Sequence, residues 1–339
     1  MIKINFISLF IILLIIYKSG TSNERLLFEG NLFTGYSQVD YSGESLLAVY
    51  AGNVIIRQPN EKEEFKILDE LNLDALLNYP IWSKSDSSIY INVEDAQVKK
   101  DLILEYKLNS GKVDTLLMLD WDVYISNYLS IDRKKHIYFY SNKTETENFS
   151  GIKELNPTTG KVQHHISIDY RSTHQDGYTL SPDEKFFLME GNISNTDERS
   201  LFLIPNTKSI TPIKPIRITQ GGFDLMGGWS SDSQKIVFTR LNQYEEGFSN
   251  IYVYSLDTKK VEQVTFTDST LNMFPIFSRN NDRIIFGRNY MPYEDIYTFG
   301  LLFEKTKNGI DLSIETINDL ESMALGQTSF EIWAVDLTF

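Results

Sequence analysis

One short motif returns six times along this chain, and the repetition leaves few folds open. Each copy is an apolar residue, a serine, a polar stretch often containing Asp, and then a β-rich run. The clearest copies span residues 228–238 and 275–286. The anchor serines are Ser42, Ser83, Ser130, Ser181, Ser230 and Ser278, separated by 41, 47, 51, 49 and 48 residues. A period near 48 residues, with several strands in each unit, predicts a β-propeller with six blades.

Each unit contains the segments of a four-stranded antiparallel blade. Ser and Asp side chains bond nearby backbone groups and form the turn between the innermost and second strands. Ile236 to Phe238 has the apolar character of a second strand buried between blades. Third strands are expected at 54–57, 102–108, 151–155, 201–204 and 251–257, and a fourth at 261–266. We therefore predict an all-β chain.

The two ends of the repeat region predict how the ring closes. Residues 330–337 look like a third strand, so the last blade lacks an outer strand of its own. Residues 26–33 are β-like and belong to no blade, so we expect them to complete the last blade and leave no open edge. An insertion at about 289–329 interrupts that blade. It contains either a short helix ending before Gly326, or segments 296–303 and 310–316 that form an extra hairpin or are the true outer strands of the blade.

The repeat resembles the TolB-like propeller repeat, a WD40-like or PD40 repeat. The family pattern is roughly P-x-W-S-P-D-G-x-x-I-x-F followed by I-Y-V-x-D-x-x-G, and residues 228–238 with 251–266 match it best. The family glycine is replaced by Ser233 or Asp282. The resemblance covers the chain from about Leu26 onward, and it implies a propeller that docks a protein in the bacterial envelope. We expect a relative of the TolB propeller that lacks the N-terminal α/β domain of TolB.

The N-terminus has the features of a signal peptide, which we place at 1–21, with the propeller at 22–339. Lys3 precedes an apolar run from Phe6 to Tyr17, shorter than the roughly 20 residues of a membrane helix. Small residues follow at 19–22, where cleavage is expected. An uncleaved anchor is the alternative. Without cysteine there are no disulfides, and a periplasmic or secreted protein must be stabilised by its large core.

Several classes of chemistry are disfavoured. The net charge of −14 opposes nucleic-acid binding, which depends on Lys and Arg neutralising phosphates. Residues 228–232 begin like a nucleophile elbow but lack its last glycine. His164 and His165 are adjacent on a predicted strand and should point to opposite faces. We therefore assign no catalytic residue, metal or cofactor.

Acidic pairs recur in the loop between the second and third strands of five blades. Because these loops share one face, they predict an acidic rim that attracts a basic protein or peptide. The alternative is that these loops are acidic only for solubility. Three aromatic residues near the rim are candidate anchors. The predicted partner-binding residues are Glu94, Asp95, Glu145, Glu147, Asp197, Glu198, Glu245, Glu246, Glu294 and Asp295, with Tyr244, Phe248 and Tyr293.

The loops that enter the innermost strands border the mouth of the central channel. They carry Asp74, Asp122, His174, Asp176, Asp224 and Asn272. We expect a monomeric, exported scaffold that binds a protein partner through one face, with no membrane span after signal cleavage. The alternatives are a carbohydrate-active or hydrolytic enzyme centred on the channel, and a structural domain of an envelope assembly.

Overall fold

The described part of the chain is built from strands and turns and contains no helix. The structure, a computed structural model, describes residues 24–30, 34–39, 46–50, 53–58, 61–65, 75–77, 80–83, 85, 87–95, 98–120, 125–141, 151–168, 178–192, 198–220, 222–241, 248–268, 270–289 and 330–337. Aromatic and β-branched residues, which favour pleated half-buried surfaces, dominate its strands. The prediction of an all-β chain is confirmed for these residues.

The first two sheets follow the chain order. The first sheet consists of β2 (Thr34–Val39), β3 (Leu46–Tyr50), β4 (Asn53–Gln58) and β5 (Glu61–Phe65). The second consists of β6 (Ala75–Leu77), β7 (Ile81–Trp82), β8 (Ser88–Asp95), β9 (Lys100–Lys107) and β10 (Lys112–Asp120). Because β6 and β7 both pair with β8, the innermost strand of this sheet is divided in two.

The next two sheets exchange a strand. One contains β11 (Ile125–Ile131), β12 (Ile137–Ser141), β13 (Gly151–Asn156), β14 (Lys161–Ile168) and β18 (Ser209–Ile213). The other contains β15 (Tyr178–Leu180), β16 (Phe186–Asn192), β17 (Arg199–Pro205) and β19 (Ile216–Arg217). The strand β18 follows β17 in the chain but pairs parallel with β14 of the preceding sheet. The sequence did not predict this parallel pairing.

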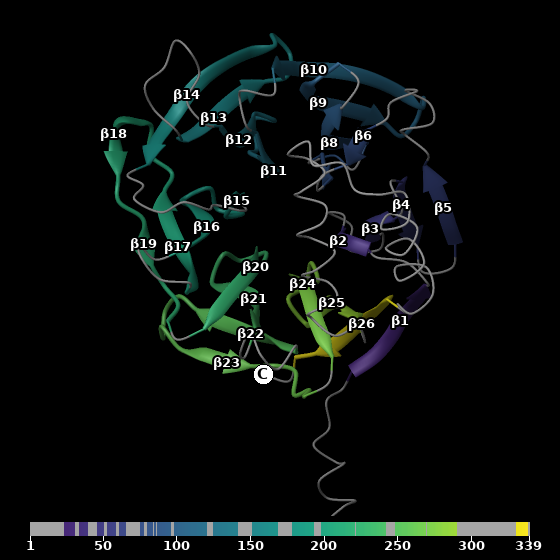
Figure 1. Cartoon of the computed structure of the whole chain (residues 1–339), viewed down its shortest axis with the longest axis vertical. Coiled ribbons are helices and arrows are strands. Elements are labelled where there is room, and N and C mark those ends of the chain that lie inside the picture. The colour runs from purple at the N-terminus through teal and green to yellow at the C-terminus, as the bar shows by residue number, and fades with distance from the viewer. Residues whose placement is uncertain are drawn as a thin grey trace, which may run out of the picture.

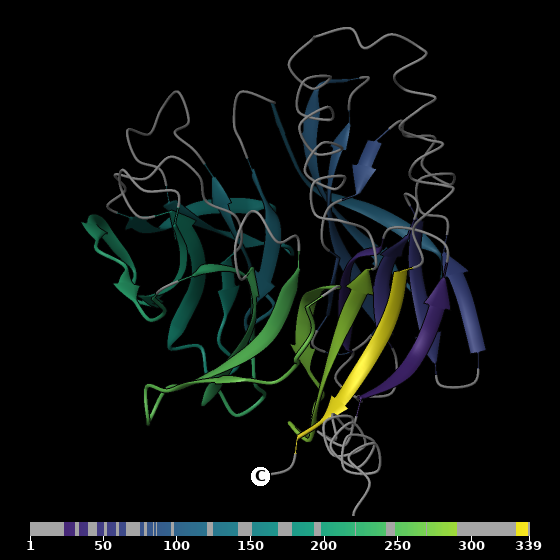
Figure 2. The same ribbon diagram turned by 60° about the horizontal axis from the view of Figure 1, so that its bottom comes forward.

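The largest sheet joins the last two repeats and the N-terminal strand. It consists of β20 (Phe223–Trp229), β21 (Lys235–Leu241), β22 (Ser249–Ser255), β23 (Val261–Gln263), β24 (Leu271–Phe277), β25 (Arg283–Asn289), β26 (Phe330–Asp336) and β1 (Glu24–Gly30). One parallel pair, Ser249 with Leu271, links β22 to β24. The expected pairing of the N-terminal segment with the C-terminal strand is present, because β1 runs antiparallel to β26 in both views (Figures 1 and 2).

The sheets lie around a common centre, and the hydrophobic core lies between neighbouring sheets. In Figure 1, β11, β15, β20 and β24 are nearest the centre, while β10, β14 and β23 are at the outside. Tyr138 and Ile166 pack with Phe187 and Ile204 of the following sheet. Leu188 and Leu201 pack in turn with Ile236 and Phe238 of the next. Burial of these faces at about 25 cal/mol per Å² of apolar surface drives the sheets together.

The anchor serines close the turn between the innermost and second strands. The Ser230 backbone N–H donates to the Lys235 carbonyl (2.9 Å), and the Lys235 N–H donates to the Ser230 hydroxyl oxygen (2.8 Å). Ser83, Ser181 and Ser278 accept equivalent bonds from residues 88, 186 and 283. The predicted turn function is confirmed at these four positions. Ser42 lies outside the described residues.

The third repeat corrects the predicted anchor. Asp132, and not Ser130, closes the turn there, because its Oδ1 accepts the N–H groups of Lys134 and His136, both at 2.8 Å. Ser130 instead bonds the neighbouring sheet, donating to the Tyr178 carbonyl (2.9 Å) and accepting from the Leu180 N–H (3.0 Å). With Asp132 as the anchor, the spacings from Ser83 onward become 49, 49, 49 and 48 residues.

The position three residues after the anchor is left-handed in the four repeats where the structure describes it. Lys135, Glu184, Ser233 and Asn281 have φ between 57° and 67°, a region that favours glycine. Asn281, and not Asp282, therefore occupies the position of the family glycine. Three of these side chains accept a backbone N–H from the preceding turn: Arg133 to Glu184 (2.7 Å), Asp183 to Ser233 (2.9 Å) and Ser231 to Asn281 (2.8 Å).

The predicted third strands at 54–57, 102–108, 151–155, 201–204 and 251–257 correspond to β4, β9, β13, β17 and β22. The predicted fourth strand at 261–266 ends earlier, because β23 covers only Val261–Gln263. The helix or hairpin expected in the insertion lies outside the described residues.

Candidate functional site

The strand connections fall at two opposite edges of the sheets. The repeated turns lie at one edge, which we call the turn face. The third strands end there as well, since Asn206, Leu256 and Leu337 donate backbone hydrogen bonds to carbonyls of these turns. Alternation of antiparallel strands places the connections between second and third strands at the other edge, which we call the loop face. The described members of the predicted acidic pairs, Glu94, Asp95 and Glu198, belong to the loop face.

The first described acidic pair lies at the end of β8. Glu94 is within the strand, opposite Asp101 of β9. Asp95 is buried, and its Oδ1 accepts the Val98 N–H at 3.2 Å, which closes the connection to β9. Asp95 thus supports the local turn, a function that the acidic pair in the sequence did not predict.

Glu198 and Phe248 are the other predicted partner-binding residues that the structure describes. Glu198 is exposed just before β17, where Arg217 Nη2 lies 3.4 Å from its Oε2. Phe248 is half-buried directly before β22. The remaining predicted residues, which are Glu145, Glu147, Asp197, Glu245, Glu246, Glu294, Asp295, Tyr244 and Tyr293, lie outside the described residues.

Asp224 and Asn272 lie in strands and not in the channel loops where the sequence placed them. Both are 0% exposed, on β20 and β24. Arg240 donates to Asp224 from Nε (2.6 Å) and Nη2 (2.9 Å), and Arg288 Nε donates to Asn272 Oδ1 (2.8 Å). These polar groups hold strands together within each repeat. Asp74, Asp122, His174 and Asp176 lie outside the described residues.

An exposed aromatic on the loop face was missed in the sequence. Phe266 is 75% exposed in the segment after β23. Asn250 fixes this segment, since its Oδ1 accepts the Thr265 hydroxyl (3.0 Å) and the Thr267 N–H (2.9 Å). The preceding repeat has exposed Gln220 at the equivalent place, because Thr219 and Thr265 both accept a third-strand N–H at 2.9 Å. Alignment of these two threonines would have identified Phe266 as an unusual exposed residue.

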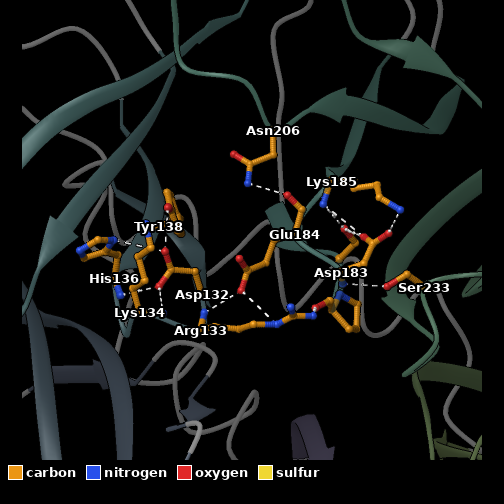
Figure 3. A network of polar contacts seen from close by, with 12 residues as sticks. Asp132, Arg133, Lys134, His136, Tyr138, Asp183, Glu184, Lys185, Asn206 and Ser233 are labelled. Atoms are coloured by element: carbon orange, nitrogen blue, oxygen red, sulfur yellow. Dashed lines mark hydrogen bonds and ion pairs between the residues drawn. The ribbon is translucent and has the colours of Figure 1, made fainter.

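A network of polar side chains occupies the turn face between the third and fourth repeats, as Figure 3 shows. It is centred on Asp132, which bonds the turn as described above and accepts the Tyr138 hydroxyl at 3.2 Å. Burial, followed by the charges of Asp132 and Glu154, raises the pKa of Tyr138 far above its ordinary value. Tyr138 therefore remains a neutral hydrogen-bond donor.

The two adjacent histidines have separate surroundings, as predicted. His164 contacts Ser167 Oγ (2.8 Å) and Lys153 Nζ (3.5 Å), whereas His165 contacts Asn206 Oδ1 (2.7 Å). Burial, reinforced by the Lys153 charge, lowers the pKa of His164. Within the described ranges, no group of three or more His, Asp or Glu side chains is arranged to hold a metal ion.

Comparison with solved structures shows the fold. TolB from Acinetobacter baumannii superposes with a TM-score of 0.52 at 14% identity, covering 76% of this chain and 60% of that chain. A putative TolB from Agrobacterium tumefaciens gives 0.53 at 13% identity, covering 71% and 83%. The fold is that of a TolB-like β-propeller. No family model and no curated protein matches this TolB-like propeller in sequence.

A second class of propeller is equally similar. An oligogalacturonate lyase in complex with manganese gives a TM-score of 0.54 at 9% identity, covering 92% of this chain and 79% of that chain. At such identities the likeness concerns the fold alone. Among the residues that the structure describes, no helix is long and apolar enough to cross a membrane.

Proposed function

We propose that this TolB-like propeller is an exported scaffold that binds a basic protein or peptide through its loop face. The observation that carries the proposal is the exposure of Phe266, fixed by Asn250, on that face. The recurrent acidic residues that the sequence predicts for the same face support it. Exposed Glu198 belongs to this set. The likeness to TolB structures supports a scaffold at the level of the fold.

The physical basis is long-range attraction combined with a short-range anchor. A face lined by carboxylates raises the association rate of a cationic partner, and salt weakens the effect. Aromatic residues on rigid supports contribute disproportionately to interface energy. We expect the acidic residues to control the association rate and Phe266 to control the dissociation rate.

The architecture and location belong to the same proposal. Counting the eight-stranded sheet as two blades joined at a single bridge gives six blades, and the pairing of β1 with β26 supports closure of the ring. We assign residues 1–21 to a signal peptide and 22–339 to one monomeric propeller, in the periplasm or secreted. The TolB-like fold is compatible with this location.

The test is capture of cross-linked partners from the native envelope fraction, followed by binding measurements with the purified partner. The rim variant changes Glu145, Glu147, Glu245 and Glu246 to Gln. The control variant changes Glu61, Glu63 and Glu64 of β5 and Glu262 of β23 to Gln, which removes the same charge from outer strands. We expect the rim variant to slow association at low salt and the control to behave like the wild type. Equal slowing by both variants would reject the loop face.

The alternative is a carbohydrate-active enzyme with its site in the central channel. The likeness to an oligogalacturonate lyase supports this alternative at the level of the fold. His174 and Asp176 would be the residues to test, since Asp224 and Asn272 are buried in strands. Cleavage of oligogalacturonides or related glycans by the wild type, abolished by His174→Ala, would establish the enzyme in place of the scaffold.

A further inference from the structure

Two strongly exposed apolar side chains lie on one short ribbon at the outside of the ring. The ribbon comprises residues 208–217 and contains β18 and β19, which Figure 1 shows away from the common centre. Ile210 is 75% exposed and Ile216 is 52% exposed. Among the large apolar side chains that the structure describes, only Phe266 is as exposed as Ile210. Exposed apolar side chains that lie together commonly mark a contact surface.

An irregularity in the pairing of β18 pushes the middle of this strand outward. The two ends of β18 pair with Ile166 and Ile168 of β14, so residues 210–212 stand opposite a single residue of β14. All three are exposed, whereas both ends of β18 are half-buried. The Ser209 hydroxyl donates to the Thr211 carbonyl at 2.7 Å, which fixes the bulge at its base. The bulge thus presents an apolar tip on a defined support.

The tip lies between cationic side chains in a protein that is acidic as a whole. Lys208 and Lys214 flank the bulge on either side, and both are exposed. The sequence contains no Asp or Glu from residue 199 to residue 223, although the net charge of the chain is −14. The ribbon is therefore a basic and apolar segment of an otherwise acidic surface.

The two lysines keep their positive charges available for a ligand. Arg217 Nη2 lies 3.4 Å from Glu198 Oε2, so the charge of this arginine is partly compensated. Lys208 Nζ instead donates to the neutral amide oxygen of Gln163 at 3.3 Å. Within the described ranges, neither Lys208 nor Lys214 forms an ion pair with a carboxylate. An anionic ligand would meet little competition at these two side chains.

The edge of β18 is poorly suited to pairing with the strand of another protein. β18 is the last strand of its sheet, but Pro212 has no backbone N–H to donate. The Thr211 carbonyl already accepts the Ser209 hydroxyl. Proline and lysine are residues that proteins place on edge strands to prevent pairing. An apolar tip between lysines matches the chemistry of an anionic lipid surface, where apolar groups enter the acyl boundary and cations contact phosphates.

We propose that the ribbon of residues 208–217 docks this propeller peripherally on a membrane that contains anionic lipids. Ile210 and Pro212 enter the interface, and Lys208 and Lys214 contact the headgroup phosphates. Because the ribbon lies at the outside of the ring, the ring meets the membrane edge-on and the loop face stays accessible to a protein partner (Figure 1). This contact does not depend on the loop face, so the two proposals can fail separately.

The expected contact is weak and reversible. Each lysine close to an anionic surface strengthens binding by about fivefold at physiological salt. Partial burial of an isoleucine side chain strengthens it by about a further tenfold. Because the lysines act through exposed charge, we expect added salt to weaken binding to anionic vesicles.

Co-sedimentation with lipid vesicles tests the proposal. The protein is used without residues 1–21, which contain none of the described strands and whose apolar run would itself bind lipid. One vesicle preparation contains about one-third phosphatidylglycerol in phosphatidylcholine, and the other contains phosphatidylcholine alone. We expect stronger binding to the anionic vesicles. The double variant Lys208→Gln/Lys214→Gln should weaken that binding about 25-fold, and Ile210→Ser should weaken it about tenfold.

Matched controls remove the same chemistry from other outer positions. Lys259→Gln/Lys260→Gln removes two exposed charges from the turn after β22, and Met118→Ser removes a side chain that is 55% exposed on β10. Both should bind vesicles like the wild type, and equal losses in the ribbon and control variants would overturn the proposal. Failure of the wild type to bind anionic vesicles would overturn it as well. If an acidic protein were then captured by the wild type and lost by the ribbon variants, the ribbon would be assigned to that protein instead.

A fluorescent probe tests the orientation without removing any contact. The chain contains no cysteine, so Thr211→Cys creates a single site for an environment-sensitive dye at the tip of the bulge. Thr258→Cys, in an exposed turn after β22, is the control. Anionic vesicles should shift the emission of the dye to the blue at position 211 only. A shift at both positions, or at neither, would contradict docking through the ribbon.

Discussion

Replacing Asp224 by alanine would remove the fully buried acceptor of an ion pair whose arginine is largely buried. Asp224 is 0% exposed and accepts two hydrogen bonds from Arg240, whose side chain is 16% exposed. Arg240 also lies 4.9 Å above the Tyr252 ring, which fixes the guanidinium within the sheet. In the alanine variant this charge would keep its cation–π contact but lose its counter-ion.

The expected cost follows from the burial of the pair. Removal of one partner from a buried ion pair destabilises a protein by about 3–5 kcal/mol, because the other charge remains uncompensated. Asn272 and Arg288 occupy the equivalent positions in the last repeat and show that an amide can serve there, with a bond of 2.8 Å. Asp224→Asn keeps an acceptor and should therefore cost about half as much as Asp224→Ala. The double variant Asp224→Ala/Arg240→Met removes both charges and should recover at least 1 kcal/mol relative to Asp224→Ala.

Urea unfolding followed by tryptophan fluorescence at pH 7 would measure these differences as shifts of the midpoint at constant m-value. The order of stability should be wild type, Asp224→Asn and then Asp224→Ala. A loss below about 1 kcal/mol for Asp224→Ala would show that the pair is solvated and that the argument from burial is wrong. Equal losses for Asn and Ala would refute the equivalence of the two repeats.

Three further predictions concern the repeated turns and one buried tyrosine. Ser233→Ala should lower the free energy of unfolding in urea by about 1–2 kcal/mol, because the Asp183 N–H loses its acceptor. Ser233→Gly should cost about 1 kcal/mol less, because glycine adopts the φ of 60° at this position without strain. The hydrogen bond from the Ser278 hydroxyl and the charge of Arg283 lower the pKa of Asp282, although burial opposes them. Ser278→Ala should therefore raise the pKa of Asp282 in a carboxyl NMR titration. The Asp282 contribution to stability, present above about pH 3.9, should then be lost at higher pH during acidification. Burial and the adjacent Glu105 raise the pKa of Tyr90 to about 12. The contribution of Tyr90 to folding stability should therefore fall as the pH rises from about 10 to 12. Tyr90→Phe should remove that alkaline loss in urea unfolding.

The positions of most strands could be predicted because the determinants are local. The serine motif and the apolar run after it fix a turn and a buried strand within a dozen residues, as in Ser230 to Phe238. The pairing of β1 with β26 could also be predicted, since one end of the repeat region lacked a strand and the other had one too many. Counting segments was sufficient for this long-range contact.

The errors arose where contacts between repeats decide the outcome. Ser130 fits the motif better than Asp132, yet it bonds Tyr178 of the neighbouring sheet and leaves the turn to the carboxylate. The parallel pairing of β18 with β14 depends on the space beside β14, which no local pattern records. Asp224 and Asn272 were placed on loops because polar residues are rare in strands, and their arginine partners lie sixteen residues further along.

The candidate site was less predictable than the fold for the same reason. A pair of acidic residues in a loop does not show whether its side chains are free for a partner or support the turn. Glu198 is exposed, whereas Asp95 closes the connection between β8 and β9. In the sequence, Phe266 stands out only if its segment is aligned with the one containing Gln220, whereas the structure shows its exposure directly.

The departures from the repeat pattern are themselves structural information. Where the family has glycine, this chain has Glu184, Ser233 and Asn281, all left-handed, and each accepts a backbone N–H from the preceding turn. A non-glycine residue in this conformation costs about 1 kcal/mol or more. The bond it makes between repeats offsets that cost and satisfies a donor that glycine would leave to water. A chain without disulfides can thus strengthen the contacts between its sheets at the positions where its repeat looks degenerate.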